Sequence, residues 1–107
     1  MFPGRLPDLN LGTNGGESAD DSLAARLLDL CERAEGFSSV LNGRFTGGYI
    51  TRHHGRPADN VHAVQLELAQ ATYMEEDPPY TYLPECAARV RPVLESLLSE
   101  MLAWAAE

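Results

Sequence analysis

The 107-residue sequence predicts an α/β fold, a piece of an α/β sandwich with about three strands and two helices. Residues 20–36 and 84–106 repeat their apolar side chains with the 3.6-residue period of amphipathic helices. Residues 61–69 alternate apolar and polar side chains, which is typical of a strand with one buried face. A chain of this length forms one small domain at most.

The first 19 residues are predicted to be a loop. They contain two prolines and four glycines and show no sustained hydrophobic period. An independent domain rarely starts in this way, because an early strand or helix is normally paired or packed. The same composition is natural for an internal loop, so we expect residues 1–19 to be an active-site loop.

The two helices have sequence signals at their ends. Asp20 or Asp21 can cap the first helix, and acidic residues there suit the helix dipole. Gly36 is expected to end it, because glycine readily takes the left-handed conformation beyond a last turn. The second helix is predicted from roughly Pro84 to Ala106, with the proline in its first turn. Pro92 lies inside this apolar pattern and should kink the helix or displace its start.

Three strands are predicted within residues 37–70, namely Phe37–Leu41, Gly48–His53 and Val61–Ala69. An Asn-Gly pair follows the first of them and favours a tight turn, so the first two strands could form a hairpin. In the third strand the leucines are expected on one face, and Gln65 and Glu67 on the other.

Composition and charge exclude several classes of function. Sixteen acidic against eight basic residues give a net charge of −8, which argues against binding to nucleic acid or to an anionic membrane surface. No apolar run approaches the ~20 residues of a membrane span, and no signal peptide is visible. The two cysteines form no CxxC motif. We therefore expect reduced thiols and a cytoplasmic protein.

Histidines raise the question of a metal site in "GGYITRHHG", residues 47–55. Neighbouring residues of a regular strand point to opposite faces, so His53 and His54 could not easily share one ion. The three histidines of the chain also lack the usual metal-ligand spacings. The sequence predicts no metal site built within this chain. The histidines are instead interpreted as polar residues at the end of a strand.

Glu67 is the candidate catalytic residue. It lies between two leucines and could point into a cleft as a general base or activator of water. A half-exposed antiparallel strand produces the same pattern with Glu67 simply facing water, and both interpretations stay open. Arg44 and Arg52 flank Gly47-Gly48 and could clamp a carboxylate, although two solvated arginines are the simpler interpretation.

Three segments together resemble a known family. "GRLPDLNLGTNGG", "LNGRFTGGYITRHHG" and "VHAVQLELAQATYM" look like successive signature blocks of the N-formylglutamate amidohydrolases, also called deformylases. The resemblance extends into the C-terminal helix. Two positions depart from the usual family pattern: His54 replaces a common tyrosine, and Glu17-Ser18-Ala19 replaces a segment that often contains Ser-Cys.

The resemblance implies a fold related to the zinc carboxypeptidases and aspartoacylases, a mixed sheet flanked by helices. It implies hydrolysis of N-formyl-L-glutamate to formate and L-glutamate in histidine degradation, with a divalent metal, most simply zinc. By resemblance, Glu67 activates water, while Arg52, Arg44 and Asn42 hold the substrate's carboxylates. His53 is a further substrate-binding candidate.

The resemblance also implies that this chain is the C-terminal part of a single amidohydrolase domain. The family's histidine-containing blocks, expected to bind the metal, precede the part seen here. We therefore expect the isolated chain to bind no metal, to be inactive, and to self-associate through exposed apolar faces. The alternative is a non-catalytic module that binds glutamate or another partner.

Overall fold

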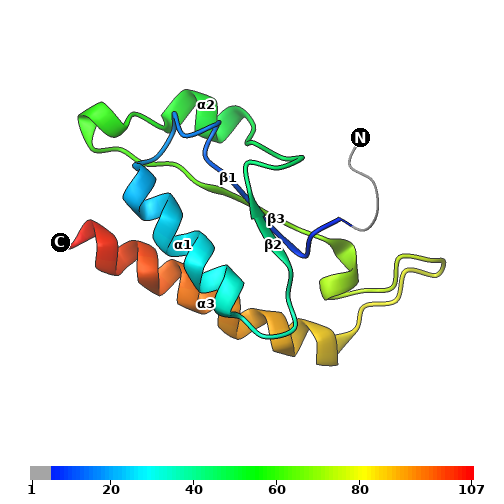
Figure 1. The fold of residues 1–107 in the computed structure, drawn as a ribbon. Helices are drawn as coiled ribbons and strands as arrows, with labels where there is room; N and C mark the ends of the chain where they lie inside the picture. The colour runs from blue at the N-terminus through cyan, green and yellow to red at the C-terminus, as the bar shows by residue number, and fades with distance from the viewer. Residues whose placement is uncertain (1–5) are drawn as a thin grey trace.

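The computed structural model describes residues 6–107 as one three-stranded sheet with helices around it (Figure 1). The elements follow one another as β1 (Leu9–Gly12), α1 (Asp21–Arg33), β2 (Ser39–Leu41), α2 (Tyr49–His54), the short 3₁₀ turn η1 (Pro57–Asp59), β3 (Gln65–Leu68), a second 3₁₀ turn η2 (Gln70–Thr72) and α3 (Pro84–Ala105). The predicted α/β class, with three strands, is confirmed.

The sheet is mixed, and β1 is its central strand. The strand order is β2-β1-β3, with β2 parallel and β3 antiparallel to β1. Leu9 of β1 lies opposite Ser39 on one side and opposite Leu68 on the other. Each outer strand therefore has one edge that no other strand among residues 6–107 occupies.

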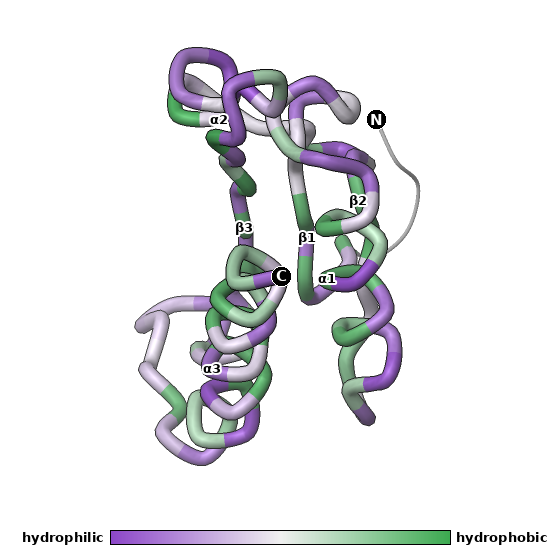
Figure 2. Tube along the Cα trace, turned by 90° about the vertical axis from the view of Figure 1, so that its left-hand side faces the viewer, coloured by the Kyte–Doolittle hydropathy of each residue, from purple (hydrophilic) through white to green (hydrophobic). Residues whose placement is uncertain are grey.

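Helices α1 and α3 pack side by side against one face of the sheet. Leu9 and Leu11 of β1 point into this core and are almost completely buried. Arg26 of α1 forms ion pairs with Glu100 of α3 and with Glu107 just beyond its end, and the two helices run antiparallel (Figure 1). Figure 2 shows α1 and α3 together, with α2 well away from both. The apolar stripes predicted for the two long helices thus form one core.

The helix ends follow the predicted signals in part. The Asp20 carboxylate accepts hydrogen bonds from the Ser22 hydroxyl (2.7 Å) and from the Ser22 N–H (2.8 Å), the second of which caps α1. These two bonds lower the pKa of Asp20. The helix ends at Arg33, earlier than predicted, and Gly36 takes a left-handed φ of 86° in the loop beyond. Helix α3 begins at Pro84 as predicted, so Pro92 does not displace its start.

The prediction of a loop over residues 1–19 is wrong for residues 9–12, which form the central strand. Leu9 and Leu11 face the core, and Asn10 and Gly12 face the other side. This alternation spans only four residues and lies next to glycines, so its period is too short to recognise. The part of this loop at residues 1–5 lies outside the described residues.

The prediction of a strand at Gly48–His53 is also wrong, because this segment forms the short helix α2. Gly47 takes a φ of 124°, and Thr51 Oγ1 donates to the Gly48 carbonyl (2.9 Å), which closes the first turn. Asn42 does make the predicted turn, with a φ of 52°, but it leads into a loop. The proposed hairpin is therefore absent, and β2 pairs in parallel with β1.

The other two strands are shorter than predicted. The segment predicted as Phe37–Leu41 is a strand only at Ser39–Leu41, and the one predicted as Val61–Ala69 only at Gln65–Leu68. The side-chain alternation in the latter is as predicted. Leu66 and Leu68 pack against the core, whereas Glu67 is exposed.

The two cysteines are free thiols in different surroundings. Cys31 of α1 is completely buried in the core, and desolvation raises its pKa to about 11. Cys86 of α3 is half-buried. Within residues 6–107 no helix combines the length and the apolar character that crossing a bilayer would need.

Candidate functional site

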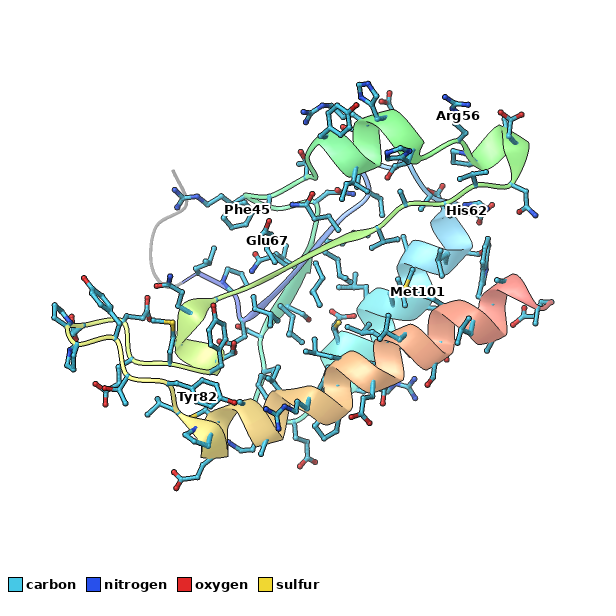
Figure 3. The ribbon with its side chains drawn as sticks, turned by 180° about the vertical axis from the view of Figure 1, so that it is seen from behind. Phe45, Arg56, His62, Glu67, Tyr82 and Met101 are labelled. Atoms are coloured by element: carbon cyan, nitrogen blue, oxygen red, sulfur yellow. The ribbon has the colours of Figure 1, made fainter. Side chains whose placement is uncertain are left out.

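The candidate site lies on the polar face of the sheet, opposite the core. We define this polar face by Asn10, Gly12, Gln65 and Glu67. In an antiparallel ladder, directly opposite residues share a face, and here Asn10 pairs with Glu67 and Gly12 with Gln65. Figure 3 shows Glu67 on the same side of β3 as Phe45, with Met101 on the other side among the helices.

Gln65 holds the Glu67 carboxylate in place. Its Nε2 donates to Glu67 Oε1 (2.7 Å), and its Oε1 accepts from the Gly48 N–H (2.7 Å) at the start of α2. Both ends of the Gln65 amide are therefore used, which fixes its orientation. Through this one side chain the exposed carboxylate on β3 is tied to the segment that contains Arg52.

Gly12 lets the chain before α2 cross closely over the end of β1. A Cβ atom at Gly12 would lie 2.7 Å from the carbonyl carbon of Thr46 and 2.9 Å from Gly47 N. The Asn14 N–H donates to the Thr46 carbonyl at 2.6 Å and secures this crossing. The segment around Gly48 is thereby placed next to the polar face, at the carboxyl end of the parallel strands β1 and β2, where ligands of open α/β sheets bind.

Asn42, a predicted substrate-binding residue, braces this end of the sheet. Its Oδ1 accepts from the N–H groups of Thr13 (2.9 Å) and Gly15 (3.3 Å), and its Nδ2 donates to Thr13 Oγ1 (2.9 Å). These bonds join the end of β2 to the loop after β1. Its predicted contact with substrate stays a prediction.

A cationic segment faces solvent beside the polar face. Between Gly36 and Ala58 the sequence contains three arginines, two histidines and no acidic residue, although the whole chain carries −8. Arg52 is exposed and donates from Nη1 to the Gly47 carbonyl (3.4 Å), next to the glycine that binds Gln65. Arg44 is also exposed, with its guanidinium 6.0 Å from the Phe45 ring centre. Both arginines leave most of their donors available to an anion.

The histidines are divided between two places. His53 stacks on Tyr49 of α2 with ring centres 3.9 Å apart, and His54 lies at the edge of the same aromatic ring. His62 makes no ring contact with them but lies against Trp104, and its Nδ1 accepts from the Asp20 N–H (3.0 Å) (Figure 3). No set of three or more His, Cys, Asp or Glu side chains within residues 6–107 is placed to hold a metal ion.

Asn10 is the most unusual polar residue of this face. It is only 1% exposed, and its Nδ2 donates to the carbonyls of Pro7 (2.8 Å) and Glu67 (3.3 Å). Its Oδ1 is buried without a partner. Sequence reasoning did not single out Asn10, Gly12 or Gln65 as site residues. The i, i+2 spacing of Gln65 and Glu67 was the available signal, since it puts both on one face of a strand.

The comparisons with known proteins place this chain in a family of amidohydrolases. A family model described as N-formylglutamate amidohydrolase matches residues 1–74. The chain belongs to the N-formylglutamate amidohydrolase family, as its sequence motifs suggested.

Two curated relatives are similar over the whole chain. N-formylglutamate deformylase of Pseudomonas aeruginosa is 59% identical over all 107 residues, and that of Pseudomonas putida is 58% identical. The chain spans 40% of the length of each of these relatives. The name N-formylglutamate deformylase therefore belongs to proteins that are much longer than this chain.

A solved structure supports the fold. The N-formylglutamate amidohydrolase of Ralstonia eutropha JMP134 superposes with a TM-score of 0.78 over the whole chain and 38% of its own length. Its sequence identity is 24%, so this match bears on the fold alone.

Proposed function

We propose that this chain provides the base and the substrate-binding wall of an enzyme that hydrolyses N-formyl-L-glutamate to formate and L-glutamate. The observation that carries the proposal is the hydrogen-bonded link from α2 through Gln65 to Glu67, in a chain of the N-formylglutamate amidohydrolase family. Attack by water on the formyl carbon and cleavage of its bond to nitrogen give the two products.

Glu67 is the proposed general base. It takes a proton from the attacking water and returns a proton to the departing amine, so that atoms and charges balance. Two features support this role: the carboxylate is exposed on the polar face, and Gln65 fixes one of its oxygens. The other oxygen, Oε2, accepts no hydrogen bond from residues 6–107 and can meet the water.

Arg52 and Arg44 are the proposed partners of the substrate's two carboxylates. N-formylglutamate is a dianion, and the cationic segment is the part of this acidic chain that attracts anions. Asn42 and His53 are proposed further contacts. Asn42 also fixes the loop after β1, and His53 lies on the exposed side of α2, stacked on Tyr49.

The donor side chains of residues 6–107 do not fit a metal site by themselves, because no three of them cluster. We propose that the complete enzyme uses a divalent metal, most simply zinc, held by other segments of the longer family chain, of which this chain spans 40%. No step is assigned to it. In this view the isolated chain is inactive, and it self-associates through its exposed apolar surfaces.

The broader setting is part of the same proposal. The parent fold would be the carboxypeptidase-like α/β/α sandwich, in which further elements cover the polar side of the sheet. The reaction would serve histidine degradation in the cytoplasm. The family membership and the three-stranded mixed sheet support these points.

The test measures formate release by the chain fused to the remaining sequence of the Pseudomonas aeruginosa relative, in that protein's own order. We expect activity from the fusion, none from the 107-residue chain, and a loss of about 10²–10⁴-fold in the fusion for Glu67→Ala. Full activity of Glu67→Ala would reject the assigned base. Formate release by the isolated chain above its own Glu67→Ala control would reject the proposed inactivity.

A non-catalytic glutamate-binding module is the second candidate, favoured by the complete cationic segment in a chain without a metal-donor cluster among its described residues. Calorimetry with L-glutamate distinguishes it. This module predicts binding by the isolated chain that is independent of metal and lost in Arg52→Ala. Arg33→Ala is the matched control, because this exposed arginine lies on α1 in an ion pair with Asp29.

A further inference from the structure

A continuous series of hydrogen bonds links Arg52 on α2 to Glu67 on β3. Arg52 Nη1 donates to the Gly47 carbonyl (3.4 Å), and the Gly48 N–H of the same peptide group donates to Gln65 Oε1 (2.7 Å). The Nε2 atom of Gln65 then donates to Glu67 Oε1 (2.7 Å). We call this series the relay: it runs from a guanidinium through one peptide group and one side-chain amide to a carboxylate.

Every donor in the relay points from the guanidinium toward the carboxylate. The peptide group and the Gln65 amide each accept at oxygen and donate at nitrogen, so their dipoles are aligned head to tail. Hydrogen bonds arranged in this way polarise and strengthen one another. The positive charge at the donor end and the negative charge at the acceptor end both favour this direction over the reverse.

Gln65 is the side chain in the middle of the relay, and its amide meets two different demands. It must present an acceptor to the Gly48 N–H and a donor to the Glu67 carboxylate. A glutamate at this position would keep the acceptor but would place a second negative oxygen against Glu67. A methionine of similar length would supply neither group.

The carboxylate of Glu67 is the part of this residue that Gln65 controls. The main chain of Glu67 is paired with Asn10 in the sheet, and Asn10 Nδ2 donates to the Glu67 carbonyl (3.3 Å). The side chain, in contrast, is exposed. Loss of the bond from Gln65 would therefore release the carboxylate while the strand beneath it stays in place.

We propose that Gln65 is a positioning residue that couples substrate binding at Arg52 to the placement of Glu67. This inference rests on the proposed function, in which Arg52 binds a carboxylate of the substrate and Glu67 is the base. A carboxylate held by Arg52 fixes the guanidinium and the start of α2, and the relay passes this order on to Glu67 Oε1. The Oε2 atom is thereby held toward the attacking water, so that correct substrate binding speeds the chemical step.

Two other roles for Gln65 predict different results. If it only braces α2 on the sheet, an acceptor for the Gly48 N–H is sufficient, and Gln65→Glu would leave the reaction unchanged. If it binds substrate directly, its loss would raise KM and leave kcat unchanged. Positioning of the base requires the donor to Glu67 and acts on kcat.

The first experiment measures formate release by the chain fused to the remaining Pseudomonas aeruginosa sequence. We expect Gln65→Glu and Gln65→Met to lower kcat by about 10–100-fold while KM changes by less than about threefold. Gln70→Glu is the matched control, since Gln70 is exposed at the start of η2, and it should leave both constants unchanged. An unchanged kcat for Gln65→Glu would overturn the proposal, as would an effect on KM alone.

The second experiment tests the coupling to Arg52 with double variants of the same fusion. We expect the losses in kcat/KM from Arg52→Ala and Gln65→Glu to multiply to at least about fivefold more than the loss of the double variant, because both substitutions break one relay. Arg44→Ala is the matched control. Its guanidinium lies beside Phe45, outside the relay, so its loss should multiply with that of Gln65→Glu. Independent effects of Arg52→Ala and Gln65→Glu would overturn the coupling.

The third experiment follows hydrogen exchange of the Gly48 amide in the fusion and does not depend on activity. We expect Gln65→Met to speed this exchange by about tenfold or more, because the amide loses its acceptor. Gln65→Glu keeps an acceptor and should leave the rate nearly unchanged. Equal exchange in the unsubstituted fusion and in Gln65→Met would show that the bond from Gly48 to Gln65 is absent and would overturn the relay.

The outcomes separate this inference from the proposed function. Activity that is lost in Glu67→Ala but kept in Gln65→Glu would reject the positioning role and leave the base standing. Full activity in Glu67→Ala would reject the base itself, and the coupling with it.

Discussion

Leu11 and Gly12 are neighbours in β1 and are both buried, but they face opposite surroundings. Leu11 packs among the leucines of α1 and β3, where its contribution is apolar burial. Gly12 lies under the backbone of Thr46, where its contribution is the absence of a side chain. The core face thus determines stability, and the polar face determines where the segment before α2 lies.

Substitution on the core face should have the largest effect on stability. Leu11→Ala removes a fully buried side chain and is expected to lower the free energy of unfolding by about 2–5 kcal/mol. Urea denaturation measures this value. Leu102→Ala is the control, since that leucine is 75% exposed and should change it by less than about 0.5 kcal/mol. Similar losses for the two variants would contradict the assigned core.

Substitution of Gly12 should have an intermediate effect and should also disturb the site. The Cβ of Gly12→Ala would meet backbone atoms of Thr46 at 2.7 Å, which is expected to cost about 1–3 kcal/mol and to shift the start of α2. Gly48→Ala meets only the end of the Gln65 side chain, at 3.3 Å, and should cost less. Denaturation and the exchange rate of the Gly48 amide test this; an unaltered Gly12→Ala protein would contradict the close crossing.

Removal of the Glu67 carboxylate should have the smallest effect on stability. Glu67→Ala loses one hydrogen bond to Gln65 at an exposed position, so the free energy of unfolding should change by about 0.5 kcal/mol or less. Thermal melting of the 107-residue chain tests this without reference to catalysis. A loss of stability as large as that of Leu11→Ala would show that Glu67 is a structural residue. It would contradict the assignment of stability to the core face alone.

Part of this organisation could be predicted from the sequence. Helices α1 and α3 are long enough for their apolar stripes to repeat several times, and β3 alternates clearly enough to put Glu67 opposite the core. The family motifs add information that hydrophobic periodicity lacks, because they assign residues 1–74, which include the candidate site, to one family.

The rest depends on contacts distant in sequence. Tyr49, Ile50 and Thr51 favour a strand by local preference, but the left-handed Gly47 and the bond from Thr51 to Gly48 close a helical turn. The parallel pairing of β2 with β1 joins segments about 30 residues apart. No turn sequence indicates this pairing, because parallel neighbours are not joined by a tight turn. Gln65 acquires its role only once Gly48 is placed beside it.

The buried thiol of Cys31 has a kinetic consequence. With its pKa raised to about 11, it supplies almost no thiolate at neutral pH, and no reagent reaches it while α1 stays packed on the sheet. Chemical labelling of Cys31 therefore requires the core to open. The labelling rate in water measures how often this opening occurs in the absence of denaturant. The half-buried Cys86 reacts in the same sample, and its labelling rate measures the reactivity of the reagent. One experiment therefore gives both the opening rate at Cys31 and the reference rate needed to interpret it.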